Sequence, residues 1–165
     1  MTDDPRPPAD SLNEQVGVLT RREIEARILK PFVAALSERF GNDEVTRILA
    51  DVVAAAATEA GRTMNDGSSD LRDFAAAWEP WFRGGALEID DIERTPERWS
   101  FNVTRCRYAE LYSSLGMAEL GATLSCNRDA ALIEGFDPEA SLTRTQTLME
   151  GKSHCDFRYR RVAPE

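Results

Sequence analysis

The spacing of apolar residues changes near residue 85 of this 165-residue chain, and this change constrains the fold more than any other feature. Before it, apolar residues recur three or four positions apart, which is the spacing of one helix face. This spacing predicts three helices, over about 20–40, about 43–60, and from Asp70 to the glycine pair at 84–85. The first half of the chain is therefore expected to be helical.

Local signals set the expected ends of two of these helices. Thr20 and Glu23 have the spacing of a capping box at the start of the first helix. Pro31 lies inside the apolar pattern of that helix, where it is expected to kink or break it. Gly61 is expected to end the second helix.

Beyond residue 85, apolar and polar residues alternate, which is typical of strands with one buried face. The predicted elements are a hairpin, a helical region broken near its glycines, and two final strands, over residues 87–103, 108–133, 141–148 and 154–162. The expected fold class is therefore α+β, with an antiparallel sheet packed with helices. We expect one domain over 19–165, with a helical part (19–84) and a sheet-containing part (85–165), behind a mobile tail at 1–18.

Composition and net charge limit the classes of binding partner and the cellular compartment that are expected. A net charge of -9 argues against nucleic acid and against an anionic membrane surface. No run of about 18 apolar residues is present, and the first ten residues lack the basic and apolar character of a secretory signal. Three cysteines cannot all pair within one chain, so free thiols and a cytoplasmic location are expected. A small molecule is the expected partner.

The three cysteines and the single histidine all lie in the last third of the chain, at Cys106, Cys126, His154 and Cys155. Each cysteine is either a small buried hydrophobe or a nucleophile, and His154 is either a surface residue or the one available imidazole. Zinc is a further alternative, but the spacings contain no C-x-x-C pair, and the strand faces also argue against a metal site. No phosphate-binding or dinucleotide motif is present, so no cofactor is expected.

Spacing also suggests which of these side chains share a surface. Cys106 precedes an expected helix start, which would lower the pKa of its thiol. Cys126 and Asp129 lie three residues apart on one helix face, where the carboxylate would raise the pKa of the thiol. The uncharged polar strand rows that include Asn102 and Thr145 fit either a ligand cavity or ordinary strand propensity.

Four segments together resemble the L-2-amino-thiazoline-4-carboxylic acid hydrolase family. They are Arg-Cys-Arg-Tyr-Ala-Glu at 105–110, Cys-Asn-Arg-Asp at 126–129, Leu-Thr-Arg-Thr-Gln-Thr-Leu at 142–148, and Gly-Lys-Ser-His-Cys-Asp-Phe at 151–157. The resemblance implies an enzyme that hydrolyses a C–N or C=N bond, since the founding activity opens a thiazoline ring to give N-carbamoyl-cysteine. The same pattern is similar to vinyl-reductase-type ligand-binding domains, which are small-molecule sensors.

The resemblance also implies roles for individual residues. Cys106 would attack the amidine-type carbon of the substrate, or Cys106 and Cys126 would line a pocket around an attacking water. Asp129 would bind or protonate a substrate nitrogen, and Arg144 would pair with a substrate carboxylate. The remaining candidates are the orienting residues Asn102, Tyr108 and Thr145 and the proton shuttle His154. By strand alternation, Arg144 and Thr145 point to opposite faces, so at most one of them reaches the pocket.

Two alternatives to an enzyme remain open at this stage. One is a non-catalytic small-molecule-binding domain of the sensor type, with the thiols lining a ligand pocket or holding zinc. The other is a protein whose helices mainly mediate a homo-oligomer, for which the alanine run at 54–57 and the tryptophans Trp78 and Trp81 would suit a helical interface.

Overall fold

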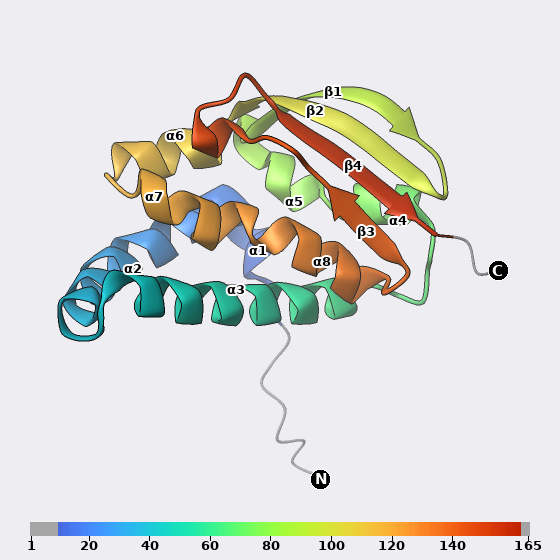
Figure 1. Ribbon diagram of the computed structural model, residues 1–165. Helices are drawn as coiled ribbons and strands as arrows, with labels where there is room; N and C mark the ends of the chain where they lie inside the picture. Colours follow the sequence, from blue (N-terminus) through green and yellow to red (C-terminus); the bar gives the residue numbers. More distant parts are fainter. Residues whose placement is uncertain (1–9, 163–165) are drawn as a thin grey trace, which may run out of the picture.

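The computed structural model describes residues 10–162, and its first half is helical (Figure 1). Helices α1 to α5 span Leu12–Val16, Val18–Phe40, Asn42–Met64, Leu71–Ala76 and Glu79–Phe82, and the short turn η1 spans Arg83–Gly85. Asp70 caps α4, because its side chain accepts a hydrogen bond from the Arg72 amide. The helical first half expected from the spacing of apolar residues is confirmed.

The second half contains the sheet and the helices that pack on it. The strands are β1 (Leu87–Arg94), β2 (Arg98–Cys106), β3 (Ala140–Thr143) and β4 (Cys155–Arg161). Between β2 and β3 run α6 (Arg107–Ser114), α7 (Ala118–Gly121), the π-helical turn η2 (Ala122–Cys126) and α8 (Arg128–Phe136), and η3 (Leu148–Glu150) precedes β4. The α+β class with an antiparallel sheet packed with helices is therefore confirmed.

The sheet has the strand order β1-β2-β4-β3, and all neighbours are antiparallel. Alternate residues of a strand point to the same face of a sheet. In β2 and β4 the residues that point to the inner face are mostly aromatic. Phe101 lies opposite Phe157 with the rings stacked at 4.8 Å, and Trp99 lies opposite Tyr159 with the rings stacked at 5.5 Å. All four side chains are buried beside Phe74 of α4, so this face forms the main hydrophobic core.

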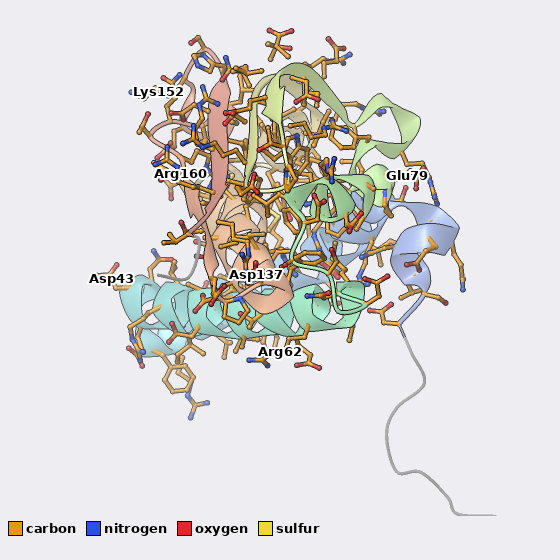
Figure 2. The ribbon with its side chains drawn as sticks, turned by 90° about the vertical axis from the view of Figure 1, so that its right-hand side faces the viewer. Asp43, Arg62, Glu79, Asp137, Lys152 and Arg160 are labelled. Carbon is orange, nitrogen blue, oxygen red and sulfur yellow. The ribbon has the colours of Figure 1, made fainter. Side chains whose placement is uncertain are left out.

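Helix α8 lies between the sheet and α3, which gives the molecule a third layer (Figure 1). In Figure 2 the long helix α3, with Asp43 near its start and Arg62 near its end, runs below α8. The two helices approach closely at two glycines. A Cβ added at Gly61 would lie 2.1 Å from the Leu132 carbonyl oxygen, and one added at Gly135 would lie 2.0 Å from the Thr58 carbonyl oxygen. Only glycine allows backbones to meet at this distance.

Several helix ends differ from the sequence expectations. Helix α2 begins at Val18, so Thr20 lies inside the helix and does not cap it. Pro31 does not break α2, which continues to Phe40. Gly61 does not end α3, because the contact with α8 favours a glycine inside the helix there and outweighs its weak helix propensity. Helix α1 occupies part of the segment expected to be a tail, and residues 1–9 of that segment lie outside the described residues.

The predicted strands agree more closely with the structure than the predicted helix ends do. The hairpin of β1 and β2 is confirmed, as is the final strand β4. The strand expected over 141–148 is wrong beyond Thr143, because the chain leaves the sheet there. The Asp156 carboxylate accepts hydrogen bonds from the amides of Thr145 and Gln146, both at 2.9 Å, and holds this segment in a turn.

We expect Gly61→Ala and Gly135→Ala each to lower the free energy of unfolding by about 2–4 kcal/mol, because the added methyl groups would overlap backbone atoms. Chemical denaturation measures this loss. Alanine is otherwise the better helix former, so a gain in stability at either position would contradict the contact. Ala56→Ser, on the exposed face of α3, is the control and should change stability by less than about 0.5 kcal/mol.

Candidate functional site

A cavity of about 50 Å³ lies where β2 and β4 meet the start of α6 and the segment formed by η2 and α8. Part of its wall is apolar and comes from Trp78, Val103 and Phe157. The rest carries thiols and ionisable side chains, namely Arg22, Cys106, Tyr108, Cys126, Arg128, Asp129, Arg144 and Cys155. A volume of this size holds a few water molecules at most.

The cavity brings together five of the eight site residues predicted from the sequence: Cys106, Tyr108, Cys126, Asp129 and Arg144. Arg144 lines it and Thr145 does not, in line with the expectation that only one of the two reaches the pocket. The structure therefore gathers the thiols and the carboxylate from β2, η2 and α8 at one place.

A buried ion pair joins two of these residues. Arg144 Nη1 donates to Asp129 Oδ2 at 2.5 Å, and both side chains are only 15% exposed. Arg144 Nη2 donates to the Cys126 carbonyl oxygen at 3.0 Å, and the guanidinium lies 4.9 Å from the Phe157 ring centre. Burial raises the pKa of the Asp129 carboxyl, and the neighbouring Arg144 charge opposes this rise. The pKa of Asp129 therefore reflects two opposing effects, burial and the charge of Arg144.

Two of the three cavity thiols, those of Cys106 and Cys126, are held in the protonated form. Burial raises the pKa of Cys106 to about 11, although the backbone amides of Ala109 and Tyr108 at the start of α6 act in the opposite direction. The expected lowering of this pKa by the helix start is therefore outweighed by burial. Burial also raises the pKa of Cys126, and the nearby Asp129 carboxylate raises it further. Neither thiol is a ready nucleophile at neutral pH.

Two further arginines, which the sequence reasoning missed, lie at the other side of the cavity. Arg22 of α2 is only 6% exposed and pairs with Glu25, and Arg128 Nη2 lies 3.9 Å from the same carboxylate. Arg128 Nε donates to the Leu124 carbonyl oxygen at 2.8 Å. Burial and the like charge of Arg22 lower the pKa of Arg128 to about 10. Arg21 Nε also lies 3.0 Å from the Glu25 carboxylate, so three guanidinium groups share it, two of which line the cavity.

A signal for Arg22 was present in the sequence. Arg22 lies four residues after Val18 and four before Ala26, both of which are buried, so helical periodicity places it on the inner face of α2. Arg128 lies inside one of the segments that carry the family resemblance, at 126–129. A charged residue on a buried helix face is itself a sign of function.

The three remaining predicted residues lie elsewhere. The Asn102 side-chain oxygen accepts from Arg158 Nη2 at 2.9 Å, and Thr145 Oγ1 donates to the Asp156 carboxylate at 2.7 Å. His154 contacts the side chains of Gln146 and Ser153 at 2.8 and 2.9 Å. None of the three lines the cavity. Thr145 has a structural contact that holds the turn after β3.

A second, more open hollow of about 300 Å³ lies on the other side of Cys126 and Arg144. Its remaining wall comes from Ala50, the first residues of η2, Asn127, Thr147 and Glu150. Cys126 and Arg144 therefore line both the inner cavity and the outer hollow. Cys126 is the last residue of a π-helical turn, an irregularity that is frequent at functional sites.

Within residues 10–162, no group of three or more histidine, cysteine or acidic side chains is placed to hold a metal ion. In the same part of the chain, no helix combines the length and the apolar character needed to cross a membrane.

The sequence matches the L-2-amino-thiazoline-4-carboxylic acid hydrolase family over residues 21–159, and the protein belongs to this family. The match includes the cavity residues from Arg22 to Phe157. The search of curated proteins gave no match.

Among solved structures, the fold is similar to the phenol-responsive sensory domain of the transcription activator PoxR, crystallised with phenol. The TM-score is 0.50 at 9% identity, over 81% of this chain and 73% of that one. At this identity the likeness concerns the fold alone. It agrees with the ligand-binding type of fold expected from the sequence.

We expect Arg144→Met to lower the free energy of unfolding by about 3–5 kcal/mol, because it leaves the buried Asp129 carboxylate without its partner. Adding Asp129→Leu to this variant should recover part of the loss, since no unpaired buried charge then remains. Denaturant unfolding of both variants measures the effect. The control Arg27→Ala breaks the exposed pair with Glu23 and should cost at most about 0.5 kcal/mol. Equal losses for Arg144→Met and Arg27→Ala would contradict the role of the buried pair.

The raised pKa of Cys106 predicts a loss of stability at alkaline pH. As the pH rises above 9.0, the unfolded chain releases this proton, whereas the folded protein keeps it up to about pH 11. The folded state then binds more protons, so the unfolding free energy falls across this range, by about 2–3 kcal/mol from this thiol. Cys106→Ala should remove that part of the alkaline loss, and the exposed substitution Ser114→Ala should not. Identical pH profiles for wild type and Cys106→Ala would contradict the burial of the thiol.

Proposed function

We propose that the protein is a hydrolase that cleaves a C–N or C=N bond in a small cyclic amidine or thiazoline-like substrate, with Asp129 as its acid–base group. One observation carries the proposal: within the segment that matches the hydrolase family, a buried carboxyl with a raised pKa lies in a cavity beside two thiols. Acid–base groups of this kind are usual in hydrolytic sites.

In the proposed reaction a water molecule is the nucleophile. Asp129 takes one proton from the water as its oxygen bonds to the amidine-type carbon. The carbon becomes tetrahedral as the C=N electron pair moves onto the ring nitrogen, and Asp129 gives its proton to that nitrogen. As the added hydroxyl group becomes a carbonyl, Asp129 takes the hydroxyl proton and passes it to the other ring atom, whose bond to the carbon breaks, so the ring opens. Arg144 keeps the carboxylate oriented through this exchange.

The thiols have a supporting role in this proposal. Their raised pKa values favour water over a thiolate as the nucleophile, since a protonated thiol is a poor nucleophile. Cys106 and Cys126 instead contribute weak S–H donors and a compact wall around the reacting carbon. The resemblance suggests either a thiol or a water molecule as the nucleophile. The burial of both sulfur atoms favours the water molecule.

Arg128 is the proposed anchor for an acidic group on the substrate. The sequence pointed to Arg144 for this role, but its guanidinium already holds Asp129 and the Cys126 carbonyl. Arg128 and Arg22 share the single carboxylate of Glu25, so the two guanidinium groups keep a net positive charge at this part of the cavity. A substrate carboxylate bound there would neutralise that charge.

Substrate binding also requires space that the inner cavity alone does not have. A ring of this type is larger than 50 Å³, whereas the outer hollow measures about 300 Å³. We propose that Cys126 and the Arg144 side chain move apart to join the two spaces when the substrate binds. The substrate would then enter from the hollow and reach Asp129.

Turnover of 2-amino-thiazoline-4-carboxylate and related cyclic amidines tests the proposal. We expect Asp129→Asn to lower kcat by at least about 100-fold, because it removes the proton-transfer group. Cys106→Ala should keep kcat within about tenfold, and Arg128→Met should mainly raise KM. The exposed substitution Asp91→Asn is the control, and circular dichroism checks the folding of each variant. Full activity of Asp129→Asn would contradict the role of Asp129.

A small-molecule sensor is the second candidate, and the likeness to the PoxR sensory domain favours it. In that case small aromatic or cyclic molecules would bind in the same cavity without being changed. Calorimetry together with product analysis separates the two candidates. Stoichiometric binding of a compound that is recovered intact, with no turnover of any amidine tested, would support the sensor.

A further inference from the structure

Helix α2 is apolar on two opposite faces. Its inner face carries Val18, Ala26 and Val33, which are buried against the rest of the protein. On the opposite side, Ile24, Ile28 and Phe32 are 63%, 70% and 60% exposed. A helix at the surface normally has one apolar and one polar face, and a helix that is apolar on both sides is normally covered on both.

These three residues, here called the outer stripe, have apolar neighbours. Pro31 and Ala35 lie on the same helix face and are also exposed. The adjacent helix α3 exposes Ile48 and Val52, at 48% and 61%, and α2 and α3 are joined by a single residue. Large apolar side chains are therefore exposed on both helices of this hairpin.

The exposed area of the outer stripe is close to what a small dimer interface needs. A large apolar side chain has roughly 150–200 Å² of surface, so the outer stripe exposes roughly 300–400 Å² of apolar surface, to which the exposed Pro31 and Ala35 add. A patch of this size matches the largest patch on a typical monomer, and such patches are often functional. A standard interface buries about 800 Å² on each partner, of which somewhat more than half is apolar.

Outside the described residues the sequence is poor in large apolar side chains, since residues 1–9 and 163–165 contain one, that of Met1. A second copy of the protein offers a matching apolar surface, because the outer stripe is nearly symmetric about Ile28. Two α2 helices packed antiparallel across a twofold axis would place Ile24 of one protomer against Phe32 of the other.

Charge also favours this helix as the meeting point of two acidic protomers. The chain as a whole carries -9, whereas α2 carries five basic and three acidic side chains. Beside the outer stripe, Arg27 already pairs with Glu23 of its own helix at 2.6 Å. Two copies of α2 therefore meet with less repulsion than the net charge of the whole chain would suggest.

We propose that the protein forms a homodimer in which the outer stripe of α2 packs against its own copy. Sedimentation velocity of the full chain measures its mass from 1 to 100 µM, and we expect that of a dimer, about twice 18.4 kDa. Ile28→Glu places two carboxylates face to face at the twofold axis, and it should raise the dissociation constant at least about 100-fold.

Ile92→Glu is the matched control, because Ile92 is 58% exposed on β1, outside the α2–α3 hairpin. It should leave the dimer intact, and circular dichroism should show both variants folded. A monomeric wild type at 100 µM, or an Ile28→Glu variant that remains dimeric, would overturn the proposal. Binding of the monomeric wild type to anionic vesicles would assign the stripe to a membrane surface and overturn it as well.

Discussion

The buried ion pair between Asp129 and Arg144 ties together the parts of the molecule on which the site depends. Asp129 belongs to the first turn of α8, and Arg144 to the segment that leaves the sheet after β3. The arginine also holds the carbonyl of Cys126, so the end of η2, the start of α8 and the edge of the sheet are fixed to one another. In a low-dielectric interior, both partners must remain together, because either one alone is costly to bury.

The burial that surrounds this pair also sets its chemistry. Removal from water raises the pKa of the carboxyl and of both neighbouring thiols, so proton exchange is favoured at Asp129 and thiolate formation is disfavoured at Cys106 and Cys126. The second group of charges, Arg22 and Arg128 around Glu25, adds positive charge at the other side of the same space. Both charge clusters therefore contribute to one cavity, whose remaining wall is mostly apolar and carries thiols.

Much of the fold could be predicted because its periodicities are strong. The alternation of Trp99, Phe101 and Val103 indicated the buried face of β2, and the structure buries all three. The failures occurred where a distant contact outweighed a local preference. Gly61 would end an isolated helix, but here it allows α3 and α8 to touch. The chain after Thr143 has the alternation of a strand, but hydrogen bonds to Asp156 hold it in a turn.

The sequence by itself determined the α+β class, the family and the set of residues from which a site could be made, because residue types and their spacing depend only on the chain. Only the tertiary structure decided which of them meet. Cys106, Cys126, Asp129 and Arg144 come from β2, η2, α8 and the segment after β3 and converge on one cavity, whereas His154 and Asn102 do not reach it. It also decided their protonation, since a pKa follows burial and neighbouring charge, and these exist only once the chain has folded.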